Sequence, residues 1–160
     1  MINEMTESVD ILPTIIDWLG GEIPVDCNGR SLLSTVETGK SNLPQRDYVI
    51  FEWDFRDLYF NKDSNKLALA PEECNLAVIR NSEWKYVHFP AFEPLLYNIK
   101  NDPNEKINLA TNSKYDKIKN DMLGKLLSHR IRHSERQMTN TKLTSSGPII
   151  SNGPSIRQIL

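Results

Sequence analysis

The sequence predicts an α+β fold in which a small antiparallel sheet of three to four strands packs against a long C-terminal helix, with a short apolar helix before the sheet. Three observations lead to this prediction. Residues 10–21 carry apolar side chains at helical spacing, residues 46–99 hold short β-rich segments separated by turns, and residues 113–133 form an amphipathic helical pattern.

The first predicted helix follows Asp10, a residue type suited to capping a helix N-terminus. Pro13 falls in the first turn, where its missing N–H costs little, and Gly20-Gly21 ends the helix. The apolar positions follow the i, i+3, i+4, i+7 rule: Leu12, Ile15, Ile16 and Leu19. Because the helix is short and strongly apolar, we expect it to need a packing partner that the residues before it do not provide.

The predicted strands lie in the middle of the chain. Residues 46–55 are enriched in β-forming aromatic and β-branched side chains. Residues 76–80 and 84–89 read as an antiparallel hairpin around the turn at Asn81-Ser82, and residues 95–99 read as the next strand. Short strands joined by hairpins predict an antiparallel sheet.

The last regular element is a helix over residues 113–133. Its apolar side chains are predicted to fall on one stripe: Tyr115, Ile118, Met122, Leu126 and Leu127. Most of its basic residues lie elsewhere on the helix, so the stripe is expected to cover one face of the sheet.

Residues 139–160 differ in character, because serine, glycine and proline break any regular periodicity while a few isoleucines remain. Two interpretations stay open. The segment is either a disordered tail or an arm that docks its isoleucines onto a neighbouring subunit.

Composition excludes several classes of function. The chain has 160 residues, 39% of them hydrophobic, and no apolar run of the length that a transmembrane helix needs. With 19 basic against 21 acidic residues it offers no field for nucleic acid or an anionic membrane. The polar N-terminus does not resemble a secretory signal, and Cys27 and Cys74 are too few for a disulfide scaffold. These features predict a cytoplasmic globular protein.

No complete catalytic apparatus can be assembled from the residues. His129 and His133 are four apart on the predicted helix, but the two arginines between them disfavour a metal, so we interpret them as solvated helix-end residues. His88 has no carboxylate near it in sequence, and neither cysteine has a paired histidine. We therefore predict no catalytic and no metal-ligating residue in this chain.

Two pairs of sequence blocks nevertheless look familiar. Residues 9–20 read VDILPTIIDWLG and residues 28–33 read NGRSLL, while WKYV at residues 84–87 precedes LYNIKNDPNEKINL at residues 96–109. In this order they resemble the D-x-x-P-T-(I/L)-L-D…G…(D/N)-G-x-S-L-L segment and the K-Y…L-Y-D-L…D-P-x-E-x-x-N-L ending of sulfatases, in the alkaline phosphatase superfamily. Finer features, such as EWDFRD at residues 52–57, resemble the phosphonate monoester hydrolase branch.

The resemblance implies a hydrolase of sulfate, phosphonate or phosphodiester esters. Members use a divalent metal (manganese, calcium or similar) and a formylglycine made from the cysteine of a C-x-P-x-R motif. Neither Cys27 nor Cys74 stands in that motif, so the nucleophile and the metal ligands are expected in a missing N-terminal catalytic part, and this chain alone is expected to be inactive. The first helix would then belong to the missing α/β catalytic domain.

The resemblance also suggests a division of the chain. Residues 1–45 would be the end of the α/β catalytic domain, residues 46–138 the sheet and long helix, and residues 139–160 a tail that joins the subunits of a homo-oligomer. The expected substrate-cleft wall comprises Trp53, Asp54, Arg56 and His88. The alternative, from a different functional class, is a non-catalytic interaction or oligomerisation module.

Overall fold

The computed structural model describes residues 4–24, 27–40, 42–55, 69–133, 141–144 and 147–150. The chain divides into two compact units, one formed by Arg46–Leu127 and the other by Met1–Gln45 together with Ser128–Leu160. Among the described residues no helix is both long enough and apolar enough to cross a membrane.

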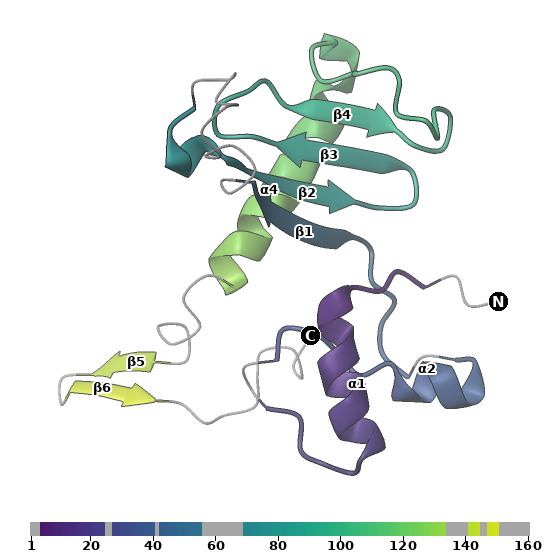
Figure 1. Ribbon diagram of the computed structural model, residues 1–160, viewed down its shortest axis with the longest axis vertical. Helices are drawn as coiled ribbons and strands as arrows, with labels where there is room; N and C mark the ends of the chain where they lie inside the picture. Colours follow the sequence, from purple (N-terminus) through teal and green to yellow (C-terminus); the bar gives the residue numbers. More distant parts are fainter. Residues whose placement is uncertain are drawn as a thin grey trace, which may run out of the picture. The chain divides into compact units, whose positions relative to one another are not determined.

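The unit Arg46–Leu127 is built on a four-stranded antiparallel sheet. Its strands are β1 (Val49–Asp54), β2 (Asn75–Arg80), β3 (Trp84–His88) and β4 (Leu95–Asn98), and they are arranged in sequence order. The helix α4 (Asp116–His133) runs diagonally across one face of this sheet (Figure 1). The predicted α+β architecture, with a small antiparallel sheet and a long helix, is confirmed.

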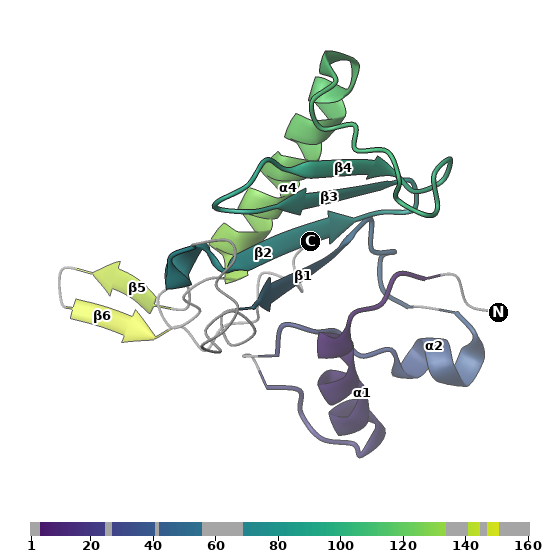
Figure 2. The ribbon, with the colours of Figure 1, turned by 45° about the horizontal axis from the view of Figure 1, so that its top comes forward.

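The core of this unit lies between the sheet and α4. Alternate strand residues point toward the helix, because successive side chains of a strand face opposite sides. The buried cluster contains Ala77, Ile79, Tyr86, Leu96, Ala110, Met122 and Leu126. Figure 2, which turns the view, again shows α4 lying along one side of the sheet.

One member of the predicted helix stripe is wrongly placed. Leu127 is 57% exposed, whereas Met122 and Leu126 are buried against the sheet. The reason is the rotation of about 100° from one helical residue to the next, which carries Leu127 away from the buried line through Met122 and Leu126.

The hairpin between β2 and β3 forms where the sequence predicted it. Asn81 Oδ1 accepts hydrogen bonds from the backbone N–H groups of Glu83 and Trp84, at 2.8 and 2.6 Å. The N–H of Asn81 in turn donates to the carbonyl of Trp84 at 2.9 Å. An asparagine that bonds the backbone ahead of it mimics a backbone turn, which explains why this short connection closes so tightly.

The second unit holds two helices and a hairpin. A 3-10 turn (Ser8–Asp10) leads into α1 (Ile11–Trp18), and α2 (Leu33–Thr38) follows a loop. Gly20 and Gly39 both take φ of +73°, the left-handed conformation that glycine adopts freely after a helix end.

Two short strands, β5 (Thr141–Thr144) and β6 (Gly147–Ile150), pair with each other in an antiparallel hairpin of the same unit. They were not among the elements predicted from the sequence.

Candidate functional site

Asp10 is the centre of a hydrogen-bond network in the unit that contains α1. Its carboxylate is fully buried, and it accepts hydrogen bonds from the backbone N–H of Glu7 at 2.8 Å and from that of Arg30 at 3.0 Å. The expected role of Asp10 as a side-chain cap of α1 is wrong, because its side chain makes no capping bond to that helix. The carboxylate instead ties the start of α1 to a loop 20 residues away in sequence.

The other polar residues of α1 reach the same loop. The hydroxyl of Thr14 donates to the carbonyl of Asp10 at 2.6 Å and accepts from the backbone N–H of Leu32 at 2.9 Å. The hydroxyl of Ser31 donates to the carboxylate of Asp17. The two sequence blocks at residues 9–20 and 28–33 therefore form a single hydrogen-bonded unit.

Gly29 allows this close approach of loop and helix. A Cβ built at Gly29 would lie 1.8 Å from the carbonyl oxygen of Val9, far inside contact distance. Only a residue without a side chain fits there, so the glycine of this block has a steric reason. The network holds the backbone of α1 and of the loop together.

The D-P-x-E segment after β4 is also a structural clamp. Asp102 Oδ2 accepts a hydrogen bond from the N–H of Ile107 at 2.9 Å, and its carbonyl accepts from the N–H of Glu105 at 3.1 Å. Glu105 sits at φ of +54°, an uncommon conformation for a residue other than glycine. Its carboxylate pairs with the Lys85 ammonium at 2.6 Å, which ties the turn to β3.

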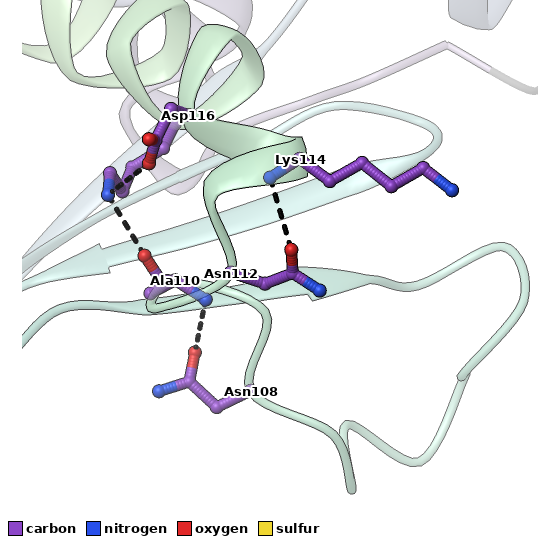
Figure 3. Close-up of polar contacts among 6 residues, drawn as sticks. Asn108, Ala110, Asn112, Lys114 and Asp116 are labelled. Atoms are coloured by element: carbon purple, nitrogen blue, oxygen red, sulfur yellow. Dashed lines mark hydrogen bonds and ion pairs between the residues drawn. The ribbon is translucent and has the colours of Figure 1, made fainter.

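Asn108 closes the outer edge of β4. Its Oδ1 accepts from the N–H groups of Leu96 and Ala110, both at 3.0 Å, and the N–H of Leu109 donates to the carbonyl of Leu96 at 2.8 Å. Figure 3 shows the bond from Asn108 to the Ala110 backbone, in the stretch that leads into α4. The asparagine therefore replaces a missing strand along this part of the edge.

Lys119 and Asn112 then fix the entry into α4. The ammonium of Lys119 donates to the carbonyl of Ala110 at 2.9 Å and to the carboxylate of Asp116 at 2.8 Å. Asn112 Oδ1 accepts from the backbone N–H of Lys114 at 3.1 Å, as Figure 3 shows. The segment between β4 and α4 is thus held in place by hydrogen bonds at both of its ends, and it joins the sheet to the helix that covers it.

Of the four residues expected in a substrate-cleft wall, the structure describes Trp53, Asp54 and His88, and these three do not share one face of the sheet. His88 is paired with Ala77, a core residue under α4, so His88 lies on the α4 face of the sheet. Trp53 is paired with Leu76 and therefore lies on the opposite face, whereas its neighbour Asp54 points to the α4 face. Arg56 lies outside the described residues.

Trp53 is half exposed and lies against one aromatic ring. Half of its surface is exposed, at 50%, and its ring lies 5.8 Å from that of the buried Phe55, measured between centroids. A half-exposed indole held against a second ring presents an apolar surface that can stack on a planar group.

His88 has a partner that sequence reasoning missed. The Tyr86 hydroxyl lies 3.2 Å from His88 Nδ1, and their rings are stacked with centroids 6.3 Å apart. Burial raises the pKa of the Tyr86 hydroxyl above its ordinary value of 10.0, so the group stays protonated near neutral pH. The available signal was their i, i+2 spacing in a strand, which places both side chains on one face.

The metal implied by the resemblance does not fit the residues that the structure describes. Within those ranges no three histidine, cysteine, aspartate or glutamate side chains come close enough together to hold a metal ion. His129 and His133 lie with ring centroids 4.3 Å apart, which makes a pair and not a complete ligand set.

Known proteins share this combination of elements. Residues 1–132 match the family described as N-sulphoglucosamine sulphohydrolase, C-terminal. The multifunctional alkaline phosphatase superfamily protein PehA of Trinickia caryophylli is 40% identical over 89% of this chain and 27% of its own length. The Δ4,5-hexuronate-2-O-sulfatase of Bacteroides thetaiotaomicron is 30% identical over 69% of this chain and 21% of its own length.

The fold of this chain is also similar to part of a solved structure. The phosphonate monoester hydrolase of Agrobacterium radiobacter is 37% identical, with a TM-score of 0.79 over 96% of this chain and 30% of its own. The chain therefore spans less than a third of the length of these relatives. The family match extends over most of the chain, and the chain belongs to the sulfatase C-terminal family of the alkaline phosphatase superfamily.

Proposed function

We propose that this chain is the C-terminal part of a hydrolase that cleaves sulfate, phosphonate or phosphodiester esters. The observation that carries the proposal is the similarity to phosphonate monoester hydrolase, with a TM-score of 0.79 and 37% identity over 96% of this chain. The similarity to PehA, at 40% identity, supports the same superfamily. The names of these relatives include phosphonate and sulfate ester hydrolases, and the phosphodiester class is kept from the sequence resemblance alone.

In this proposal the chain supplies scaffolding around a reaction centre located elsewhere. The sequence contains no C-x-P-x-R motif, so the formylglycine nucleophile and the divalent metal are assigned to an N-terminal catalytic part. The Asp10 network and the Asn108 clamp hold backbone segments together, which supports a scaffolding role. The chain alone is therefore expected to be inactive.

The proposed contribution to substrate binding comes from the cleft-wall residues. Trp53 offers a ring face for a planar leaving group, and Arg56 is of the right type to pair with a substrate anion. The protonated Tyr86 hydroxyl can donate to His88 Nδ1, which would leave the other ring nitrogen of a neutral His88 as a donor toward an anionic ester. Because Trp53 and His88 occupy opposite faces of the sheet, we propose that each acts singly.

Two assays test the function. Purified chain is incubated with an aryl sulfate or a phosphonate monoester, with and without manganese, and no turnover is expected. Metal-dependent hydrolysis by this chain would refute the proposal.

In the second assay, this chain replaces the matching C-terminal segment of PehA. The chimera is expected to keep ester hydrolysis, and Trp53→Ala is expected to raise KM for aryl esters more than for alkyl esters. A folded chimera without hydrolysis would contradict the proposal.

The β5–β6 hairpin favours a second candidate, an oligomerisation module. The two strands pair only with each other among the described residues, and an isolated two-stranded hairpin is marginally stable in water. In this candidate a surface on another subunit would stabilise the hairpin. Analytical ultracentrifugation of the full chain and of residues 1–138 tests this candidate: an oligomer that dissociates on truncation supports it, and a monomeric full chain contradicts it.

A further inference from the structure

The last turn of α4 carries two histidines on one side. His129 and His133 are four residues apart, and at about 100° per residue this spacing places them about 40° apart around the helix. Their rings have centroids 4.3 Å apart and are tilted by 45° to each other. Both side chains are half-buried, so they are less solvated than the sequence suggested. The two imidazoles therefore form one defined pair.

A loop residue fixes the orientation of one of these rings. His133 Nδ1 lies 3.1 Å from Asn28 Oδ1, a residue 105 positions away in sequence. An amide oxygen only accepts hydrogen bonds, so Nδ1 of His133 is the donor and carries the proton. In a neutral ring, Nε2 then has the lone pair with which imidazole binds a metal ion. Histidines that bind metals typically donate their other N–H to a carbonyl or carboxylate oxygen in this way.

Arg130 and Arg132 stand between the two histidines in sequence but not on the surface of the helix. Each arginine is next to one histidine, so it is rotated from that histidine by about 100°, and the two arginines lie on opposite sides of the pair. Both are exposed, where water screens their charge. The pair also lies at the C-terminal end of α4, where the helix dipole favours a cation. The electrostatic cost of a cation at this pair is therefore smaller than the sequence alone suggests.

We propose that His129 and His133 bind one divalent late transition-metal ion, such as Cu²⁺, Ni²⁺ or Zn²⁺, and that Asn28 is a positioning residue for His133. These ions favour imidazole nitrogen as a ligand, whereas Ca²⁺ and Mg²⁺ favour oxygen. Two rings that each bind one ion at about 2.1 Å have centroids roughly 5 Å apart, so small side-chain rotations from the present 4.3 Å are enough. Water completes the coordination, because among the described residues no group of three such ligand side chains forms. This proposal does not depend on the proposed function.

The ion would act on the structure at two places. It would link positions 129 and 133, which holds the last turn of α4 together. It would also polarise the ring of His133 and so strengthen the hydrogen bond to Asn28 in the loop. Peptides over residues 28–33 and 128–133 should therefore exchange their amide hydrogens several-fold more slowly when Zn²⁺ is present, and peptides from β2 and β3 should be unaffected.

Metal binding is measured by isothermal titration calorimetry on the full chain without a histidine tag. One ion per chain is expected, with Cu²⁺ bound more tightly than Ni²⁺ or Zn²⁺ and with no binding of Ca²⁺ or Mg²⁺. His129→Ala and His133→Ala should each lower the affinity at least about tenfold, because a single ligand loses the advantage of two linked ligands. The chain has three histidines, so His88→Ala is the matched control and should leave the affinity unchanged. Circular dichroism confirms that every variant is folded.

The positioning role of Asn28 has its own readout. Asn28→Ala removes the acceptor for His133 Nδ1 and should weaken binding about tenfold. Asn28→Asp should restore the affinity, because a carboxylate oxygen also accepts from Nδ1. Unchanged affinity in Asn28→Ala, or a loss of equal size in Asn28→Asp, would overturn the positioning role.

A measurement on the unsubstituted chain keeps the proposal testable even if a variant does not fold. Cu²⁺ is paramagnetic, and the NMR signals of the His129 and His133 rings should broaden at lower Cu²⁺ concentrations than those of His88. Three results would overturn the proposal: no saturable binding of Cu²⁺, Ni²⁺ or Zn²⁺, broadening of His88 first, or a loss of affinity in His88→Ala as large as that in His129→Ala. A loss of that size in Cys27→Ser would place a thiolate in the site and would also overturn it.

Discussion

Replacement of Asp10 by alanine should destabilise the unit around α1 strongly. The carboxylate is fully buried and accepts two backbone hydrogen bonds, from Glu7 at 2.8 Å and from Arg30 at 3.0 Å. A buried donor that loses its acceptor costs about 1–3 kcal/mol, so the loss of both acceptors in Asp10→Ala should cost about 2–6 kcal/mol. Asp10→Asn keeps one acceptor oxygen and should cost roughly half as much.

Hydrogen exchange measured by mass spectrometry is the suitable assay, because it reports the two units separately. A loss of about 2 kcal/mol lowers amide protection by roughly thirtyfold, so the peptides over residues 5–19 and 28–33 should exchange at least that much faster in Asp10→Ala. Peptides from β2 and β3 should be unaffected. Glu22→Ala, at an exposed site near the end of α1, is the matched control. Protection within about threefold of the parent protein in Asp10→Ala would refute the reasoning, since it would mean that water replaces the carboxylate without cost.

Three further predictions concern stability. Gly29→Ala should lower the free energy of unfolding, measured with denaturant, by more than about 2 kcal/mol, because its Cβ would lie 1.8 Å from the Val9 carbonyl oxygen. An unchanged free energy of unfolding would mean that the loop shifts freely. Met122 is 1% exposed, so Met122→Ala should lower the free energy of unfolding by about 2–5 kcal/mol. Leu127 is 57% exposed, so Leu127→Ala should change it by no more than about 0.5 kcal/mol. Equal effects of the two substitutions would contradict the orientation of α4. Folding raises the pKa of Tyr86 above 10.0, so the contribution of this hydroxyl to stability is complete below pH 10 and falls as the pH rises past 10. Tyr86→Phe should therefore make the melting temperature decline less steeply at alkaline pH. An identical decline in both proteins would count against the pKa shift.

The sheet and its covering helix were predictable because their signals are local. Alternating β-forming residues and the Asn81 turn specify a hairpin within a few residues, and the line through Met122 and Leu126 specifies the buried side of α4. The exact width of that buried side was not predictable, since whether Leu127 is covered depends on how the helix lies on the sheet. The β5–β6 hairpin was missed because its segment has weak strand propensity and contains Pro148.

The candidate site was less accessible to sequence reasoning. The residue types of a cleft wall were recognisable, but which face each occupies depends on strand register, which opposes His88 to Ala77 and Trp53 to Leu76. The partners of Asp10 were also beyond local reasoning, because a carboxylate before a helix usually caps that helix, whereas this one binds a loop 20 residues away.

The Asn108 clamp has a consequence for how this protein behaves at high concentration. The outward N–H and C=O of Leu96 are both taken, by the Asn108 side chain and by the Leu109 N–H. A strand from another molecule therefore cannot form backbone hydrogen bonds with Leu96, so the sheet cannot be extended by another molecule at this position. Asn108→Ala would release the Leu96 N–H and is expected to make this edge a template for aggregation.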